Sequence, residues 1–370
     1  MSPDPGLASW LQLSLTPGLG ASTVRSLLRQ FGLPDAVLVR QRSELASFLA
    51  PAVLEALHSS RIRDAVERAL EWAAADDHFV ITLADETYPH ALLEIADPPP
   101  LLYAHGRLPL LRQAALAVVG SRNASAQGES NAEHFATALS AAGLTIVSGL
   151  ALGIDAAAHR GGLAGGSSTI AVLGTGIDVV YPTRNAELAA QIARDGLLVS
   201  EFPLGTPAIA HNFPRRNRLI SGLARGCLVV EAALASGSLI TARCAADQGR
   251  DVFAIPGSIH SPLSKGCHAL IKSGAKLVES AEDVLAELAG FRPSGYASTA
   301  ASTAANAAQT DSGLLAIMGH DPVDVDSLCV RAGLSAEQVA SELLRLELDG
   351  RVTALPGGLY QRLEKAQRGQ

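Results

Sequence analysis

The chain has 370 residues, of which 48% are hydrophobic and 18% charged, and its formal net charge at pH 7 is −7. This length allows two or three domains with separate cores, and the acidic balance excludes a uniformly basic, histone-like protein. The four cysteines form no CxxC pair, which argues against a zinc site or a disulfide framework. Neither a secretory signal nor a membrane-length apolar run is evident, so we expect a cytoplasmic protein without a membrane span.

Residues 1–78 are expected to form a small helical domain, because apolar residues recur at helical spacing in short segments such as 22–31. The turn at 15–20 contains a Pro-Gly-Leu-Gly sequence similar to that of a helix-hairpin-helix (SAM-like) module, whose glycines let backbone amides approach a DNA phosphate. An ordinary turn in a small helical domain is the alternative, since only Arg25 and Arg29 lie nearby.

Residues 79–291 alternate short β-branched segments with helical ones. This alternation is typical of a parallel sheet covered by helices, and it predicts an α/β domain with an extended Rossmann-like core. The predicted strands are 79–83, 116–119, 145–148, 169–173, 197–200, 228–230 and 252–255. The predicted helices between them include 129–142, 155–164, 186–195 and 239–248.

The segment 292–312 consists mainly of small residues without periodicity and is expected to be a flexible linker. Residues 313–370 follow the plan of a winged-helix domain, with three helices and a glycine-tipped hairpin. The third helix of such a domain usually enters the major groove of DNA. Here it carries several acids and Arg345, so we expect protein interaction or a role in stability rather than DNA reading.

Turns rich in glycine and serine follow the predicted strands of the sheet. Because the carboxyl ends of parallel strands meet at one edge, we expect these turns to form one ligand-binding rim. Their backbone amides favour an anion, and Arg122 and Arg184 lie on the same rim, so the pattern predicts phosphate binding. The turn residues of the predicted site are Gly120, Ser121, Ser148, Gly149, Ser236 and Gly237.

The segment 212–222 is a basic island in an acidic chain, since no Asp or Glu occurs between Glu201 and Glu231. Such an island needs a local anionic partner, and nucleic acid is the first candidate. Its ring at position 213 either stacks on a base or anchors the core. The predicted DNA-contacting residues here are Phe213, Arg215, Arg216, Asn217 and Arg218, and Lys265 extends the groove from a nearby loop.

Other chemistry has weaker support in the sequence. Asp155 and His159 lie four residues apart on a predicted helix, where a structural cap and packing pair is expected over acid–base catalysis. Glu201 and Glu231 end two strands at the rim and either orient the arginines or line a lost active site. The P-loop motif and the dinucleotide fingerprint with its ribose-binding acid are absent, and we expect neither a cofactor nor a metal site.

Several ordered phrases resemble the DNA-processing protein A (DprA/Smf) family. They are Gly-Ser-Arg at 120–122, Ser-Gly-Leu-Ala-Leu-Gly-Ile-Asp-Ala-Ala-Ala-His-Arg at 148–160, Ile-Asp-Val-Val-Tyr-Pro at 177–182, Phe-Pro-Arg-Arg-Asn-Arg-Leu-Ile-Ser-Gly-Leu at 213–223 and Glu-Ala-Ala-Leu-Ala-Ser-Gly-Ser-Leu-Ile-Thr-Ala at 231–242. The resemblance implies single-stranded DNA binding, a homodimer formed through the Rossmann domain, and loading of the RecA recombinase during natural transformation.

The same resemblance places the family's DNA-contacting arginines on Arg122, Arg215, Arg216 and Arg218. Some members carry a lysine directly after Tyr-Pro, whereas this chain has a threonine there, followed by Arg184. We therefore expect a non-enzymatic recombination mediator, with single-strand-binding protein as a further candidate partner.

Two other classes of protein remain as alternatives. A nucleotide-hydrolysing enzyme with a Rossmann-like fold is one, but the Pro-Gly-Gly-x-Gly-Thr-x-x-Glu motif of the phosphoribohydrolases is absent. A winged-helix regulator that binds duplex DNA is the other, and the acidic third helix opposes it.

Overall fold

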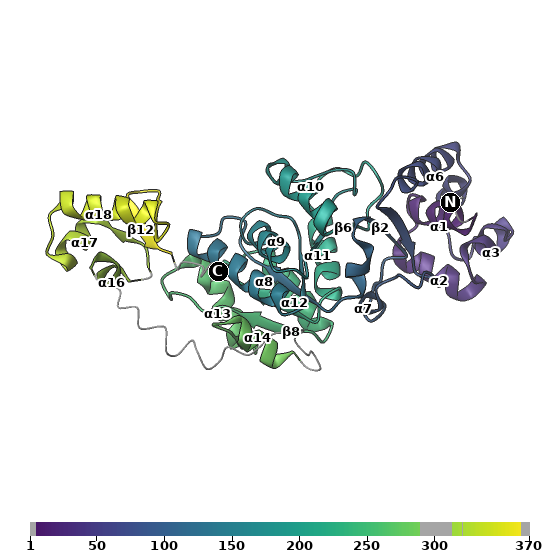
Figure 1. The fold of residues 1–370 in the computed structure, drawn as a ribbon. Coiled ribbons are helices and arrows are strands. Elements are labelled where there is room, and N and C mark those ends of the chain that lie inside the picture. The colour runs from purple at the N-terminus through teal and green to yellow at the C-terminus, as the bar shows by residue number, and fades with distance from the viewer. Residues whose placement is uncertain (1–4, 289–312, 320, 364–370) are drawn as a thin grey trace.

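The computed structural model describes residues 5–288, 313–319 and 321–363. The N-terminal helices lie at one end of the molecule, a large sheet with its helices lies in the middle, and a small three-stranded unit lies at the other end (Figure 1). The predicted linker at 292–312 falls outside the described residues. Within those described, no helix is long and apolar enough to cross a membrane.

Short helices build the N-terminal part, as predicted, and most of their apolar side chains pack around Leu13 and Leu27. Trp10 and Leu11 turn away from this cluster and join the apolar residues on one face of the sheet, so the helices are packed against the central domain. The helices are α1 (Pro5–Leu15), α2 (Ala21–Phe31), α3 (Pro34–Leu38), α4 (Arg42–Leu45), α5 (Pro51–Leu57) and α6 (Ser60–Ala73).

The central sheet is nine-stranded, in the order β1-β2-β6-β5-β4-β3-β7-β8-β9. The strands are β1 (His78–Thr82), β2 (Leu101–Gly106), β3 (Ala115–Val119), β4 (Thr145–Ser148), β5 (Thr169–Val172), β6 (Leu197–Ser200), β7 (Gly226–Val229), β8 (Asp251–Ala254) and β9 (Lys276–Leu277).

The predicted parallel arrangement is confirmed for β3 to β8 but is wrong for β1. Strand β9, which was not predicted, also pairs parallel with β8. Strand β1 pairs antiparallel with β2, which in turn pairs antiparallel with β6 at this edge of the sheet. The sheet is therefore mixed. Strand β2 was not among the predicted strands, because a long connection containing α7 (His90–Leu93) joins it to β1 and no tight hairpin turn marks the pairing.

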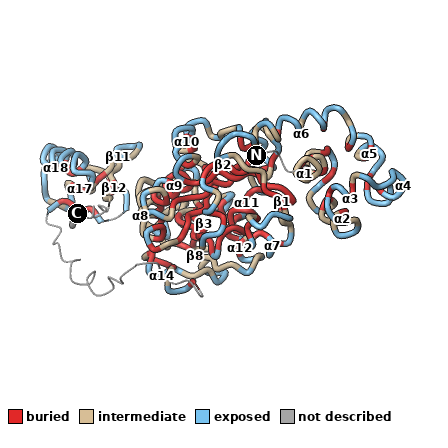
Figure 2. The backbone as a smooth tube through the Cα atoms, turned by 45° about the vertical axis from the view of Figure 1, so that its right-hand side comes forward, coloured by how far each residue is buried: buried red, intermediate tan, exposed pale blue. Residues whose placement is uncertain are grey.

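Helices cover both faces of the sheet, and the strands are buried between them (Figure 2). In β3, Leu116 and Val118 face the cluster under α8 and α9, while Ala117 and Val119 face the opposite cluster, as the two-residue period of a strand requires. The helices are α8 (Ala126–Ala141), α9 (Ile154–Ala164), α10 (Ala186–Asp195), α11 (Asn212–Gly222), α12 (Ser238–Asp247), α13 (Lys265–Lys272) and α14 (Ala281–Glu287), with short 3-10 turns η1 (Leu108–Arg112), η2 (Thr183–Asn185) and η3 (Pro262–Ser264).

The strand order reverses next to β3, which pairs with β4 on one side and with β7 on the other. In an open parallel sheet, such a reversal separates the turns that follow the two neighbouring strands and leaves a crevice at their carboxyl ends. The fold therefore positions a crevice between the turns after β3 and β7.

The C-terminal unit has the predicted winged-helix plan, with its core around Leu328 and Leu343. Arg345 lies on its third helix and pairs with two acids of the same helix surface, Glu342 at 2.5 Å and Asp349 at 3.8 Å. The guanidinium of Arg345, the one basic group of that helix, is therefore engaged in ion pairs within the same domain. The elements are α16 (Leu314–Met318), β10 (Val323–Asp324), α17 (Val325–Ala332), α18 (Ala336–Leu348), β11 (Val352–Leu355) and β12 (Leu359–Arg362).

Candidate nucleic-acid interface

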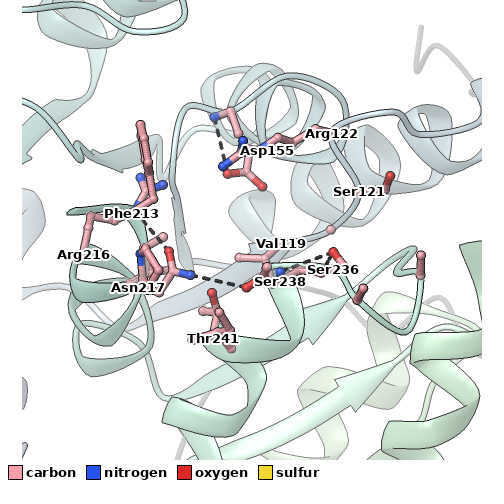
Figure 3. A pocket seen from close by; sticks show the side chains of 18 of the residues that line it. Val119, Ser121, Arg122, Asp155, Phe213, Arg216, Asn217, Ser236, Ser238 and Thr241 are labelled. Atoms are coloured by element: carbon pink, nitrogen blue, oxygen red, sulfur yellow. Dashed lines mark hydrogen bonds between the residues drawn. The ribbon is translucent and has the colours of Figure 1, made fainter. Parts of the chain in front are cut away.

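A cavity of about 690 Å³ lies at the crevice between β3 and β7. Figure 3 shows Phe213, Arg216 and Asn217 on one side of it, with Arg122 and Asp155 on another. The rim predicted from the sequence thus exists at this point of the sheet. The predicted site residues that line the cavity are Gly120, Ser121, Arg122, Phe213, Arg216, Asn217, Ser236 and Gly237.

The ring of Phe213 is anchored in the fold and also lines the cavity. A Cβ at Gly174, in the turn after β5, would lie 2.7 Å from the Phe213 Cδ1 atom, so only glycine lets the ring pack there. The Arg122 guanidinium carbon lies 5.6 Å from the ring centroid, within the range of a cation–π contact. The ring of Tyr181 lies at the same centroid separation, 5.6 Å, with a tilt of 41°. Aromatic and cationic groups are therefore combined at one place on the rim.

Arg216 is a buried cation at the cavity, with only 4% of the residue exposed. Its Nη1 atom donates to the Gly149 carbonyl oxygen at 2.6 Å and to the Val172 carbonyl oxygen, and its Nε donates to Asn217 Oδ1 at 3.2 Å. Burial lowers the pKa of Arg216 to about 10, whereas the charge of Asp155 acts in the opposite direction. The side chain stays charged at neutral pH, so the cavity carries a fixed positive charge held by carbonyl groups.

The turn after β4 is held in place from below by Asp155 and His159. Asp155 Oδ2 accepts hydrogen bonds from the backbone of Gly149 at 3.1 Å and Ala151 at 3.4 Å. His159 Nε2 accepts from the backbone of Leu150, which has a φ of 58°. Burial lowers the pKa of His159 to about 3, so the imidazole is neutral. The predicted structural pair is confirmed, because both side chains serve the backbone of the turn.

Glu231 also has a structural role at the rim. Its carboxylate accepts from the Ser125 backbone at 2.9 Å and from Ser125 Oγ at 2.6 Å, just before α8. Its backbone carbonyl accepts from the Ser121 amide at 2.8 Å. Burial raises the pKa of this carboxyl, whereas the bonds from Ser125 lower it. Glu231 therefore fastens the start of α8 to the turn after β3 rather than orienting the arginines. A place in a lost active site stays a prediction.

The basic island does not form one wall, because it folds as helix α11 and its arginines diverge around the helix. Arg215 and Arg218 leave the cavity and pair with Glu201 at 3.0 Å and 2.5 Å, and Arg218 also lies 3.7 Å from Asp97. Burial raises the pKa of Glu201, and Arg218 and then Arg215 lower it. The expectation that Glu201 orients the arginines is confirmed. The expectation that all three arginines face one groove with Arg122 and Arg184 is wrong.

Four further predicted residues also lie outside the cavity: Gly149, whose carbonyl oxygen accepts from Arg216, and Ser148, Arg184 and Lys265. Ser148 is buried, and its Oγ donates to the Val118 carbonyl oxygen at 2.7 Å, which ties β4 to β3. Arg184 lies exposed in η2, and Lys265 lies exposed at the start of α13, where its Nζ donates to the Ile259 carbonyl oxygen. DNA contacts by Arg184 and Lys265 stay predictions.

Sequence reasoning missed several groups that line the cavity. Tyr181 comes from the turn after β5, and Ser238 and Thr241 come from the first turn of α12. Tyr181 and Thr241 belong to the sequence phrases that resemble the family, and this resemblance was the signal that could have identified them as site residues. Within the described part of the chain, no group of three or more His, Cys, Asp or Glu side chains could hold a metal ion.

Comparison with known proteins covers most of the chain. The family described as DNA recombination-mediator protein A matches residues 79–289, and the DprA winged helix domain matches residues 298–358. Protein Smf of Escherichia coli (strain K12) is 46% identical over 310 residues, which is 82% of each chain. DNA processing protein DprA of Streptococcus pneumoniae (strain R6) is 52% identical over 206 residues, covering 56% of this chain and 73% of that protein.

Two solved structures are similar in fold and sequence. DNA processing protein A from Streptococcus pneumoniae superposes with a TM-score of 0.68 at 40% identity, covering 79% of this chain and 100% of that one. DNA processing protein A from Helicobacter pylori, whose structure concerns its single-stranded DNA binding mode, has a TM-score of 0.51 at 30% identity and covers 55% of this chain and 93% of that one.

Proposed function

Because this chain belongs to the DNA recombination-mediator protein A family, we propose that it binds single-stranded DNA at the cavity between β3 and β7 and mediates recombination without catalysis. The observation that carries the proposal is the ring of Phe213 with the Arg122 guanidinium over it, beside the buried charge of Arg216. Single-strand binders combine a cationic groove with aromatic stacking platforms. The single-stranded DNA binding described for the Helicobacter pylori relative supports the proposal.

Each part of the cavity has a role in this proposal. Arg122 is exposed and contacts phosphate, while the nearly buried Arg216 supplies a fixed positive potential at the cavity wall. The backbone of the turns, including the Gly237 amide, lies close to phosphate oxygens and donates hydrogen bonds to them, because little side chain covers it. A base stacks on Phe213, and since stacking reads no base edge, binding depends weakly on sequence.

We further propose that the chain acts as a homodimer in the cytoplasm, where it loads RecA recombinase onto strands taken up in natural transformation, with single-strand-binding protein as a further partner. The assigned domains are a helical domain at 1–78, the Rossmann-like domain at 79–291 and the winged-helix domain at 313–370, joined to the core by the 292–312 segment. The paired state of Arg345 supports a role other than DNA reading for the winged helix.

The test is a titration of a labelled single-stranded oligonucleotide and its duplex at two salt concentrations. We expect a preference for the single strand. Phe213→Leu removes the stacking surface and should weaken binding by about 1–3 kcal/mol at both salt concentrations. Arg122→Ala should weaken binding and reduce the salt slope by about 1, because one phosphate contact is lost. Arg61→Ala is the matched control, since Arg61 is an exposed arginine on α6 outside the cavity.

Preference for duplex DNA, or full single-strand affinity in both cavity variants, would contradict the proposal. RecA loading is tested separately, by the rate at which RecA assembles on a single strand already coated with single-strand-binding protein. The wild-type protein should raise that rate, and Phe213→Leu should not.

A further inference from the structure

A second cavity, of about 250 Å³, lies between the N-terminal helices and the rim of the sheet. The turn after α1, including Thr16 and Gly20, forms one wall. The other wall comes from β2 and from the residues that follow β6, among them Tyr103 and Glu201. Arg215 of α11 also lines it. This cavity thus joins two domains of the chain at the same rim as the first cavity.

Three of the lining residues carry a buried polar atom that lacks a hydrogen-bond partner among the described residues: Ser14 Oγ, Tyr103 OH and Glu201 Oε1. Native proteins leave few buried polar groups unpaired, since each one has lost its water without compensation. The two hydroxyl groups can donate or accept, and the carboxylate oxygen can only accept. Their gathering around one small cavity indicates a polar occupant that offers both acceptors and an N–H or O–H donor.

The charges around this cavity favour an anion over a cation. Glu201 Oε2 is already engaged by Arg215 and Arg218. Arg25 of α2 pairs with Asp97 at 2.6 Å, and Asp97 also lies near Arg218. Three guanidinium groups therefore face two carboxylates, which leaves one positive charge. Arg215 is the accessible member, since 49% of its side chain is exposed.

The size and the position of the second cavity limit the kinds of molecule that can occupy it. A volume of 250 Å³ falls below the roughly 300–1,000 Å³ of pockets that hold a drug-sized ligand, so one ring system fits and a larger molecule does not. Phe213 and Arg215 stand two residues apart in the first turn of α11, and Phe213 lines the first cavity whereas Arg215 lines the second. The first turn of α11 therefore borders both cavities.

Building on the proposed function, we propose that this second cavity takes one nucleobase of the bound single strand. The base edge donates an N–H to Glu201 Oε1 and accepts hydrogen bonds from the hydroxyl groups of Tyr103 and Ser14. The phosphate of the same nucleotide lies at the exposed guanidinium of Arg215. The N-terminal domain thereby contributes one wall of a base-binding subsite, through side-chain chemistry rather than through the amides of a helix-hairpin-helix.

The test uses the full-length double variant Tyr103→Phe with Ser14→Ala, which removes both hydroxyl groups and little volume. A set of otherwise identical oligonucleotides carries a single abasic position that is moved stepwise along the strand. For the wild-type protein, we expect one position at which the missing base lowers affinity about threefold to tenfold, as for one or two net hydrogen bonds. In the double variant this position-specific loss should disappear, while the loss at the position that stacks on Phe213 should remain.

The matched control is Tyr360→Phe, which removes a tyrosine hydroxyl in the winged-helix domain and should leave the abasic profile unchanged. The melting temperature of the free double variant should equal or exceed that of the wild type, because two unpaired buried groups are removed. A lower melting temperature together with an unchanged abasic profile would show that the hydroxyl groups hold buried water, and would overturn the inference.

The remaining outcomes separate this inference from the proposed function. If the wild-type protein binds no single strand, both fail. If it binds single strands and the double variant keeps the same abasic profile, only the second-cavity inference fails. A parallel titration with free deoxynucleoside monophosphates distinguishes the source of the base. Tight binding of a free mononucleotide that the double variant abolishes, without a change in the abasic profile, would assign the cavity to a free nucleotide and overturn the strand-base inference.

Discussion

Arg216 Nη1 donates a hydrogen bond of 2.6 Å to the carbonyl oxygen of Gly149, and its guanidinium group fills the space that a side chain at Gly149 would need. A Cβ at that position would come within 2.5 Å of the same nitrogen. Helix α11 and the turn after β4 therefore depend on each other. The buried charge is held only because the residue facing it has no side chain.

Gly149→Ala is expected to lower the free energy of unfolding by about 1–3 kcal/mol, because the added methyl group displaces a buried guanidinium from its carbonyl partners. Denaturant unfolding measures the change. Gly237→Ala is the matched control at another turn of the rim, since nothing lies within 4 Å of a Cβ there, and it should stay within about 0.5 kcal/mol of the wild type. Equal stability of the two variants would contradict the packing described for Arg216.

Arg218→Ala should destabilise the fold more than Arg215→Ala, although both arginines pair with Glu201. The Glu201 side chain is only 2% exposed and that of Arg218 only 14%, so the loss of Arg218 leaves a buried carboxylate with a single, more exposed partner. We expect a loss near the lower end of about 3–5 kcal/mol for Arg218→Ala, and about 1 kcal/mol or less for Arg215→Ala.

A double-mutant cycle with Glu201→Gln checks the origin of this effect. Most of the Arg218→Ala loss should disappear when the carboxylate is already neutral. If the loss is the same in both backgrounds, Arg218 acts through packing and not through the ion pair. If an Arg215/Arg218 double variant binds DNA less tightly, part of that loss is therefore expected to come from a destabilised fold and not only from a lost phosphate contact.

His159 should make the protein less stable as the pH falls below neutrality. Burial holds its folded pKa at about 3, so the unfolded chain, with a histidine pKa of about 6.5, binds the extra proton first. Stability therefore rises with pH across this window. Each unit below about pH 6.5 should remove about 1.4 kcal/mol of unfolding free energy until the folded pKa is reached.

Urea unfolding at several pH values between 4 and 8 measures this dependence, and subtraction of the His159→Gln profile removes the contributions of the buried carboxyl groups. The difference between the two profiles should grow toward low pH and vanish above about pH 7.5. If the difference between the two profiles does not change with pH, the conclusion that the buried His159 imidazole is neutral is contradicted.

Arg345→Ala should leave the affinity for single-stranded and duplex DNA within twofold of the wild type. The reason is that Glu342 and Asp349 pair with this arginine on α18, so little of its charge is offered to a phosphate. Filter binding with single-stranded and with duplex DNA at low salt measures the two affinities. A selective loss of duplex binding would instead make the winged helix a DNA reader.

Local pattern predicted most of the central domain and the winged helix. The parallel strands from β3 to β7 are short, fully buried runs that are mostly apolar, and helices of the expected period separate them, so alternation alone indicates their arrangement. Strand β2 escaped prediction because its partners lie far from it along the chain, and the contacts that define it are made only in the folded sheet.

The sequence by itself determined that the turns rich in glycine and serine gather at one rim, because strand direction follows from the order of strands and helices along the chain. It also determined the presence of Phe213 and of the arginines in one short segment. Only the tertiary structure decided what each of them faces. A helix turns by 100° per residue, so Arg216 points under the cavity, while Arg215 and Arg218 point to a carboxylate supplied by another strand end. Burial and pairing, which depend on residues distant in sequence, separate the charge that is available to DNA from the charge that holds the fold.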